Sequence, residues 1–242
     1  MKNWVVYRHK FLLGDIHGTW SVILNHLRRV GEDQICYIQV GDFGIGYNKP
    51  DYELDKLKIL DQELRNAKSD LFIVRGNHDD PEWFRIGKFD DYKNQLTNIF
   101  FVPDYTVLNL DFENILFVGG AVSIDRNYNK MNGGKWWKDE VVSFYFDKVA
   151  ELRDIDRMIC HTAPDFVEPL AFNQLVYNFA TQDDLLLGDL RNERENMTKL
   201  VTDVMKNNKL KGYYYGHFHQ NYHFYHNDCE FICLSINVFR PL

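Results

Sequence analysis

Long apolar runs, cysteine and positive charge are all scarce in this sequence. No apolar run among the 242 residues approaches the roughly 20 residues that span a bilayer, so we expect no membrane span. Lysine and arginine number 28 against 35 aspartates and glutamates, which gives a net charge of −7 without a basic run. A protein that follows a nucleic-acid backbone carries the opposite surplus, so we do not expect a nucleic-acid polymer as partner.

The cysteines are too few and too scattered for a disulfide framework. There are four, and the closest two, Cys229 and Cys233, are separated by three residues rather than by the two that are typical of zinc sites. We therefore expect buried thiols in a reducing compartment, which predicts a cytoplasmic location.

The chain has enough apolar residues for a sizeable core, since 45% of it is hydrophobic. No internal repeat, low-complexity tract or linker rich in proline, glycine or serine divides it, so we predict one domain over residues 1–242. Within this domain we expect a variable segment over about 165–210. It combines an irregular stretch from about 165 to 181 with a charged helical stretch over 183–207.

Short apolar runs rich in β-branched and aromatic residues predict strands. They lie at residues 10–13, 35–40, 71–74, 99–102, 114–118, 157–160, 212–215 and 231–236. Helical periodicity over 19–30 and 52–67 makes the first third alternate strand and helix, which predicts a parallel sheet with crossover helices. Later strands, over about 99–125 and 212–237, follow one another with short turns and predict antiparallel meanders. The expected class is α/β with a mixed or second sheet.

Side chains that bind metals gather at the ends of five predicted strands. They are Asp15 and His17 between Gly14 and Gly18, Asp42 after Gly41, Asn77, His78 and Asp79 after Gly76, His161, and His217 and His219 after Gly216. Sites form at the carboxyl edge of an open α/β sheet, so we expect these side chains to meet. Extended backbone also points residues two apart, such as Asp15 and His17, in the same direction.

The donor types favour two hard or borderline metal ions. Oxygen and imidazole ligands without thiolate suit Mn²⁺, Fe or Zn²⁺, with Mn²⁺ as our first expectation, and the candidates exceed what one tetrahedral ion needs. Two divalent ions are the economical inference. A carboxylate between two ions about 3.5–4 Å apart would bridge them, and a shared hydroxide would be a nucleophile near neutral pH.

The ordered set of these five blocks, from residue 14 to residue 219, resembles the calcineurin-like metallophosphoesterase superfamily. The resemblance implies a sandwich of two mixed β-sheets flanked by helices. It also implies one metal held by Asp15, His17 and His219, a second held by Asn77, His161 and His217, and Asp42 as the bridge between them. His78 would be the general acid that protonates the leaving oxygen, and Asp79 would orient His78.

One block departs from the protein-phosphatase branch of this superfamily. That branch continues as Gly-Asp-x-x-Asp-Arg-Gly, whereas Ile45, Gly46 and Tyr47 stand at the last three positions here. The missing arginine argues against a phosphoprotein substrate. Our candidate for the phosphate contact is Arg126, and the alternative is an exposed Arg126 paired with Asp125 or Glu140.

Several other residues have two interpretations. Tyr213 to Tyr215 suit base stacking, but we favour a core role, because alternating aromatics in a strand usually fill the space between layers. We expect His26 to pack with the apolar face of its helix. The segment with Ser123 to Arg126 and Lys135 to Trp137 either reaches the mouth of the site or packs its tryptophans under the next helix.

These observations predict a metal-dependent phosphoric ester hydrolase that acts by in-line attack of a metal-bridging hydroxide with a histidine general acid. Phosphate monoesters and diesters both stay open, as substrates that are phosphorylated small molecules or nucleotides. One alternative is a nucleotide phosphodiesterase or pyrophosphohydrolase that uses the same site. The other is a non-catalytic binding scaffold, which we disfavour because His78 and all the expected ligand positions are intact.

Overall fold

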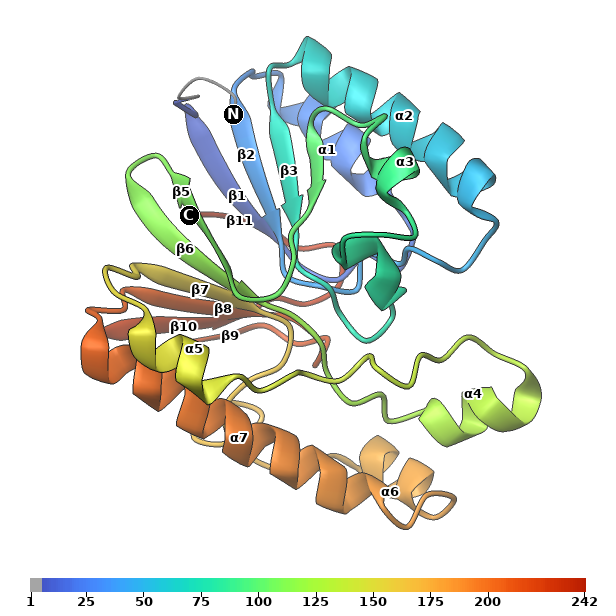
Figure 1. The fold of residues 1–242 in the computed structure, drawn as a ribbon, viewed down its shortest axis with the longest axis vertical. Helices are drawn as coiled ribbons and strands as arrows, with labels where there is room; N and C mark the ends of the chain where they lie inside the picture. Colours follow the sequence, from blue (N-terminus) through green and yellow to red (C-terminus); the bar gives the residue numbers. More distant parts are fainter. Residues whose placement is uncertain (1–5) are drawn as a thin grey trace.

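Two β-sheets packed against each other form the centre of the computed structural model, which describes residues 6–242 (Figure 1). The first sheet contains, in spatial order, β11 (Phe239–Pro241), β1 (His9–Leu13), β2 (Ile35–Gln39), β3 (Asp70–Ile73) and β4 (Ile99–Phe101). The second contains β5 (Thr106–Leu110), β6 (Glu113–Val118), β7 (Arg157–Cys160), β8 (Gly212–Tyr215), β10 (Cys229–Cys233) and β9 (Tyr222–His226). The strands β1 to β4 are parallel, as are β6, β7, β8 and β10, while β11, β5 and β9 run antiparallel at the edges. Both sheets are therefore mixed, as predicted.

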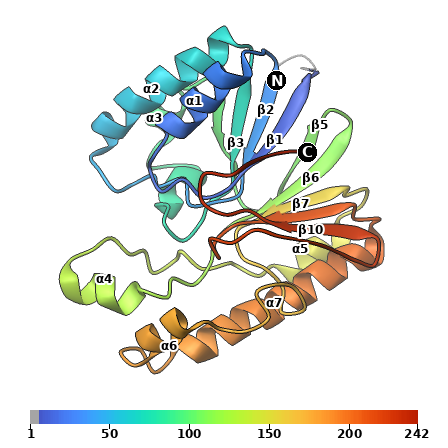
Figure 2. The ribbon, with the colours of Figure 1, turned by 180° about the vertical axis from the view of Figure 1, so that it is seen from behind.

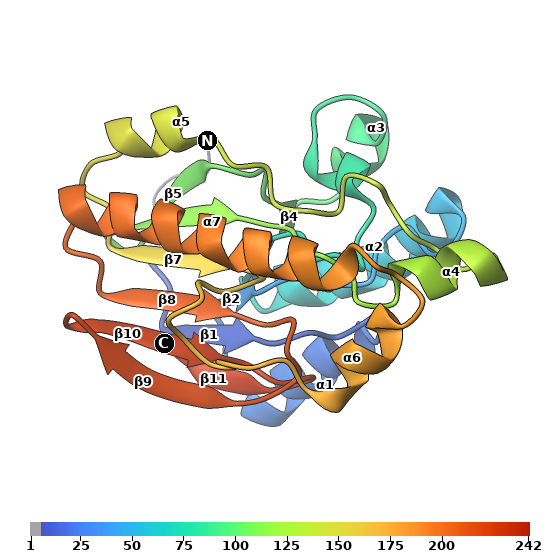
Figure 3. The same cartoon turned by 90° about the horizontal axis from the view of Figure 1, so that it is seen from below.

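Helices cover the outer face of each sheet (Figures 1 and 2). The first sheet is flanked by α1 (Ser21–Val30), α2 (Pro50–Asn66) and the short α3 (Asp90–Lys93), which follows the 3₁₀ helix η1 (Pro81–Phe84). The second is flanked by α5 (Phe146–Glu151) and α7 (Leu186–Asn207), and α7 lies along that sheet in Figure 3. The short helices α4 (Arg126–Asn132) and α6 (Gln174–Ala180) lie together at one end of α7. Among the helices of residues 6–242, none is both long and apolar enough to cross a membrane.

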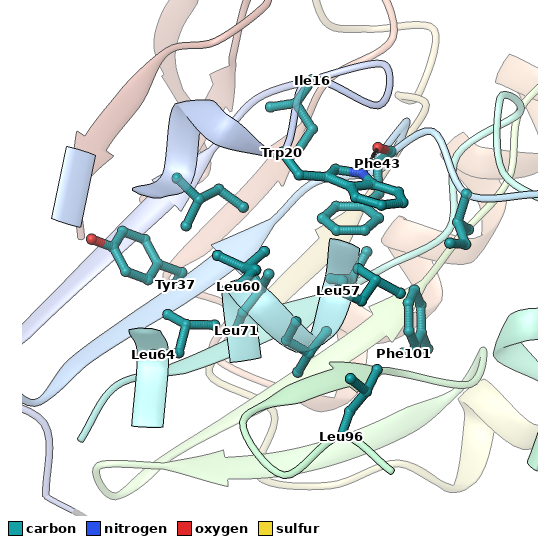
Figure 4. Packing of buried hydrophobic residues seen from close by; sticks show 14 of the residues in the cluster. Ile16, Trp20, Tyr37, Phe43, Leu57, Leu60, Leu64, Leu71, Leu96 and Phe101 are labelled. Atoms are coloured by element: carbon teal, nitrogen blue, oxygen red, sulfur yellow. Dashed lines mark hydrogen bonds between the residues drawn. The ribbon is translucent and has the colours of Figure 1, made fainter. Parts of the chain in front are cut away.

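The side-chain alternation of the strands creates two apolar layers around the first sheet. In β2, Tyr37 faces the helices and packs with Leu57 of α2, whereas Ile38 faces the second sheet and packs in one cluster with Phe117 of β6. Figure 4 shows the helix-facing layer, in which Tyr37, Leu57, Leu60, Leu64 and Leu71 come together. Because both faces of these strands are buried, their sequences are continuous apolar runs rather than alternating ones.

Most elements agree with the sequence-based predictions. The eight predicted apolar runs all form strands, and the helical patterns over 19–30, 52–67 and 183–207 form α1, α2 and α7. Tyr213, Tyr214 and Tyr215 are fully buried, which confirms their core role. His26 is also buried, stacked on Phe239 with ring centroids 3.8 Å apart and hydrogen-bonded to the Tyr37 hydroxyl at 3.0 Å.

The predicted meanders are wrong in two places. β4 pairs in parallel with β3 and so belongs to the first sheet, which leaves only β5 and β6 as a hairpin. In the C-terminal part, β8 pairs in parallel with β10, and β9 lies outside β10 at the sheet edge. The stretch expected to be irregular over 165–181 also contains α6. Strand order depends on contacts between distant segments, which turn length does not determine.

A matched pair of phenylalanines tests the inter-sheet core. Phe117 is fully buried between the sheets, whereas Phe112, in the turn before β6, is 80% exposed. We expect Phe117→Ala to lower the free energy of unfolding by about 3–5 kcal/mol, through lost burial and a residual cavity. Phe112→Ala should change it by less than about 0.5 kcal/mol. Urea denaturation of both variants checks this, and similar losses for the two would contradict the assigned core.

Candidate metal centre

The predicted ligands lie in loops at the carboxyl ends of five parallel strands drawn from both sheets. Asp15 and His17 follow β1, Asp42 follows β2, Asn77 follows β3, His161 follows β7, and His217 and His219 follow β8. The two sheets meet at this edge, since Nε2 of His17 lies 3.1 Å from Nε2 of His219. A second contact joins His161 Nε2 to Asp42 Oδ1 at 3.1 Å. The strands thus bring together residues up to 202 positions apart in the chain.

Four of these residues form one compact donor group. Ligand atoms of Asp15, His17, Asp42 and His219 all lie within 4.8 Å of one another. Nε2 of His219 is 3.3 Å from Asp15 Oδ2, so two imidazole nitrogens and a carboxylate oxygen converge on one point. Such a set of oxygen and nitrogen donors is one that a divalent transition metal or zinc accepts.

A second donor group lies on the other side of Asp42. Nε2 of His161 is 3.1 Å from Asn77 Oδ1 and 3.1 Å from Asp42 Oδ1, and the ring of His217 lies 5.1 Å from that of His161. Asp42 Oδ2 is 3.9 Å from His17 Nε2 in the first group. Asp42 is therefore the carboxylate that lies beside both groups.

The centre combines an ionised carboxylate with histidines whose pKa values are shifted in opposite directions. Burial lowers the pKa of His17. Burial and the nearby charge of His161 together hold the pKa of His217 well below its usual range. Burial acts in the same direction on His161, but the Asp42 carboxylate outweighs it and raises the pKa of His161 to about 9. Burial alone would raise the pKa of Asp42, yet His161 holds it well below its usual range. Asp42 stays ionised at the centre, and the neutral imidazoles of His17 and His217 are in the form that metals bind.

The backbone of the centre is unusual in two respects. His17, Asp42, His217 and His219 all have positive φ, between 43° and 67°, a conformation in which aspartate, asparagine and histidine are the best tolerated residues after glycine. A Cβ at position 76 would lie 2.1 Å from Asp42 Oδ1. Glycine at this position therefore permits the close approach of the Asp42 carboxylate to the backbone.

Aromatic side chains of the hydrophobic core pack against the loop that carries Asp42. Trp20 stacks on Phe43 at a centroid distance of 5.3 Å, and its indole nitrogen donates to the Phe43 carbonyl at 2.9 Å (Figure 4). Phe43 continues this contact into the core through Phe101, at 6.0 Å. The hydrophobic layer of the first sheet thus fixes the residue next to the central carboxylate.

Asp79 has a different role from the one expected. Its buried carboxylate accepts hydrogen bonds from the backbone N–H groups of Phe43, Gly44, Ile45 and Gly76, at 2.7–3.2 Å. The expectation that Asp79 orients His78 is therefore corrected: Asp79 instead ties the loop after β2 to the loop after β3. Backbone donors satisfy this carboxylate and leave the imidazole of His78 to another partner.

That partner is Tyr47. Its hydroxyl lies 2.8 Å from Nδ1 of His78, while the backbone N–H of His78 donates to Asp42 Oδ1 at 2.8 Å. The partly exposed ring of His78 packs edge-on against His17, with centroids 5.3 Å apart. His78 is thus beside the donor groups and accessible to a ligand.

Asn77 is oriented by a short chain of hydrogen bonds. Its amide nitrogen donates to Ser123 Oγ at 2.9 Å, and that hydroxyl donates to Glu140 Oε2 at 2.8 Å. The backbone N–H of Ser123 donates to the other oxygen of Glu140 at 2.8 Å. Because the amide nitrogen is used in this way, the amide oxygen faces His161 and is free to bind a metal.

The segment with the two tryptophans does reach the site. Trp137 packs edge-on against Tyr47, with ring centroids 5.4 Å apart, and Ser123 contacts Asn77. Trp136 is covered by the ammonium group of Lys130, 3.6 Å from its ring centre. Of the two arrangements considered, the structure therefore favours the one at the mouth of the site.

Arg126 has partners other than those we considered. Its guanidinium binds both oxygens of Asp183, at 2.6 and 3.2 Å, and Asp189 of α7 at 2.7 Å. This pairing joins the start of α4 to the segment before α7 and to α7 itself. A contact between Arg126 and a phosphate stays a prediction, and the contacts seen here give the side chain a structural role.

The comparison with protein families decides the classification. The sequence model of the family described as calcineurin-like phosphoesterase matches residues 11–221, a range that includes every predicted ligand. The chain belongs to the calcineurin-like phosphoesterase family. The fold agrees with this, because two mixed sheets with flanking helices are also found in its structural neighbours.

Solved structures share the fold of this phosphoesterase at low sequence identity. The protein TT1561 of Thermus thermophilus matches with a TM-score of 0.53 and 11% identity, over 95% of this chain and 90% of the other. A candidate 5′-nucleotidase from Staphylococcus aureus matches with a TM-score of 0.50 and 14% identity, over 94% of this chain and 48% of the other. A search of curated proteins gave no match.

Three residues of this phosphoesterase site escaped the sequence analysis in their present roles: Tyr47, Ser123 and Glu140. Tyr47 was noted only as a departure from the phosphatase pattern, and that departure was the available signal. Ser123 lies in a segment that attracted attention for its arginine and tryptophans. Nothing in the sequence joins Glu140 to Asn77, because the link runs through a hydroxyl and is set by tertiary packing.

Asp42→Asn tests the central carboxylate. Asparagine keeps the shape and tolerates the positive φ, so the change removes mainly charge. We expect binding of Mn²⁺ or Zn²⁺ to weaken at least about tenfold, or 1.4 kcal/mol, at both positions. Calorimetric titration measures this, with Asp55→Asn on the exposed face of α2 as the matched control. Two ions bound with unchanged affinity would show that Asp42 is not shared.

Ser123→Ala tests the orientation of the Asn77 amide. Without the hydroxyl, the amide loses the partner of its nitrogen, and partners of this kind typically affect metal affinity by about 10–100-fold. We expect one of two bound ions to be weakened by about tenfold while the other is unaffected. Metal titration checks this against Ser21→Ala, at the exposed start of α1. Equal weakening of both ions would argue for a general structural effect.

Proposed function

We propose that this member of the family hydrolyses phosphate esters with two divalent metal ions. The observation that carries the proposal is the Asp42 carboxylate, which lies beside two groups of donors. Asp15, His17 and His219 would hold one ion. Asn77, His161 and His217 would hold the second, and Asp42 would be shared.

The donor chemistry fits this assignment. The groups offer carboxylate, amide and imidazole atoms and no thiolate, which agrees with Mn²⁺ as the first candidate and with Fe or Zn²⁺ as alternatives. When bound, such ions supply Lewis acidity at the phosphate and activate the attacking water for in-line displacement. The glycine-rich loops of the chain set the spacing of the donors. Asp42 contributes a fixed negative charge.

The general acid would be His78. It lies beside His17 without belonging to either donor group, it is partly exposed, and its Nδ1 is occupied by Tyr47. That contact leaves Nε2 to protonate the leaving oxygen as the bond to phosphorus breaks. His78 thus combines access to substrate with a fixed ring, which a proton donor in this reaction needs.

The substrate is expected to be a phosphorylated small molecule or a nucleotide. Tyr47 and Trp137 form an aromatic pair beside His78, and such rings accept a nucleobase by stacking. This observation favours nucleotide phosphodiesterase or pyrophosphohydrolase activity as the second candidate, and the fold shared with a candidate nucleotidase agrees with it. A phosphoprotein is disfavoured because no arginine follows Asp42 in its loop.

A non-catalytic scaffold is the weaker alternative, because the donor groups and His78 are intact and partly accessible. Buried, unpaired cysteines agree with the reducing cytoplasm as the expected location. A panel of aryl monoesters, aryl diesters, cyclic nucleotides, dinucleoside polyphosphates and a phosphopeptide, each with Mn²⁺, tests the proposal. Turnover of any ester that is lost on chelation supports it, whereas metal binding without turnover of the panel supports the scaffold.

His78→Ala separates the acid from the metal ligands. We expect unchanged metal content and turnover of an alkyl ester about 10²–10⁴-fold slower, because the leaving alkoxide is then unprotonated. A nitrophenyl ester, whose leaving group is stable without a proton, should be slowed much less. His9→Ala, at the exposed start of β1, is the control. Loss of a metal ion, or equal slowing of both esters, would contradict the role of a general acid.

A further inference from the structure

We propose that Tyr47 is a positioning residue for His78, one that holds the imidazole through Nδ1 so that Nε2 faces the reacting ester. The proposal deepens the function above and rests on it. It assigns to a phenol the orienting role that the sequence analysis gave to the carboxylate of Asp79. Three features support it: the contact, the anchoring of Tyr47 and the absence of a competing partner among the described residues.

The contact is short, and the tyrosine ring has a second aromatic neighbour. The Tyr47 hydroxyl lies 2.8 Å from Nδ1 of His78. The tyrosine ring also meets Trp137 edge-on, at 5.4 Å and an interplanar angle of 86°. These two contacts limit the rotation of the phenol, which in turn restricts the rotation of the imidazole that it contacts.

The backbone on both sides of Tyr47 is anchored by one buried carboxylate. Glu53, in the first turns of α2, accepts hydrogen bonds from the backbone N–H of Gly46 at 3.0 and 3.1 Å and from that of Asn48 at 2.9 Å. Glu53 is fully buried, so these bonds are shielded from water. A carboxylate that fixes residues 46 and 48 leaves little freedom to residue 47. The backbone at Tyr47 is thus fixed from both sides, while the residue itself is 38% exposed.

Within residues 6–242, the structure gives His78 Nδ1 no other hydrogen-bond partner. Asp79, its neighbour in sequence, is occupied by backbone N–H groups of the loops after β2 and β3. Burial, together with the nearby Asp42 and Asp79 carboxylates, raises the pKa of Tyr47, so the hydroxyl stays protonated and neutral. A neutral oxygen accepts the Nδ1–H of the acid form of His78 without placing a further negative charge in the centre.

The proton balance of the step is simple. Water attacks phosphorus and releases a proton to solvent, the bond from phosphorus to the leaving oxygen breaks with its electron pair on that oxygen, and the Nε2–H proton of His78 passes to it. The imidazole is left neutral, with its remaining proton on Nδ1 and donated to the Tyr47 oxygen. Solvent then restores the proton on Nε2. Tyr47 exchanges no proton in this sequence and acts only through the orientation of His78.

Tyr47→Phe tests the inference, since it removes the hydroxyl and keeps the ring against Trp137. We expect kcat for an alkyl ester to fall by about tenfold with KM unchanged, and kcat for a nitrophenyl ester to fall by less than about twofold. Tyr225→Phe, at a largely exposed position of β9, is the matched control and should leave both values unchanged. A tenfold loss shared equally by both esters would overturn the role.

A double variant separates positioning through His78 from a structural effect. In a His78→Ala background the phenol has no imidazole to orient, so we expect Tyr47→Phe to cause no further loss. Independent losses that multiply would contradict the proposal.

A measurement that needs no turnover completes the test. NMR of the full chain, metal-free and loaded with Zn²⁺, follows the exchange of the His78 Nδ1 proton with water. We expect slow exchange in the natural sequence and in Tyr225→Phe, and fast exchange in Tyr47→Phe. Fast exchange in all three would overturn the contact. If no ester is hydrolysed, the proposed function fails while this measurement still tests Tyr47, so the two failures are distinguishable.

Discussion

The buried carboxylate of Asp79 is the contact on which the geometry of the site depends. It gathers backbone N–H groups from the loop after β2 and from the loop after β3, and so fixes one loop against the other. The first loop carries Asp42 and Tyr47, and the second carries Asn77 and His78. The two loops that carry these four side chains are therefore fixed against each other by a residue that belongs to neither donor group. Unpaired N–H groups in this dry environment would each cost about 1–3 kcal/mol, so the arrangement is strongly determined.

The two sheets contribute different parts of the centre. The first sheet supplies the carboxylates and His78 on three adjacent parallel strands, and the second supplies imidazoles after β7 and β8. Neither sheet holds a complete donor group, because Asp15 needs His219 and Asn77 needs His161. The apolar layer between the sheets, in which Ile38 meets Phe117, thus positions the donors of one sheet against those of the other. In this fold, the packing of the core determines the distances between the donor atoms.

The sequence was sufficient for those features that local pattern encodes. Apolar runs located eight of the strands but not β5, β9 or β11, and residues such as Asp15 and His17 could be chosen because their spacing and their place at strand ends are local properties. The features that escaped prediction depend on contacts across the chain. The pairing of β4 with β3, the hydrogen bond between Tyr47 and His78 and the pairing of Arg126 with Asp183 each join segments whose proximity follows only from the packed fold.

The left-handed backbone at the ligands has a consequence for how this site would change over evolution. His17, Asp42, His217 and His219 combine metal-binding chemistry with a conformation that most residues adopt only at a cost of about 1–3 kcal/mol. Two independent selective pressures, one for donor atoms and one for the left-handed backbone conformation, therefore act on the same positions. In a descendant that no longer needed these donor atoms, selection for donor chemistry would vanish but selection for the backbone conformation would persist. Asparagine or glycine should accumulate there before alanine or a β-branched residue, so the backbone of the site would outlast its donor side chains.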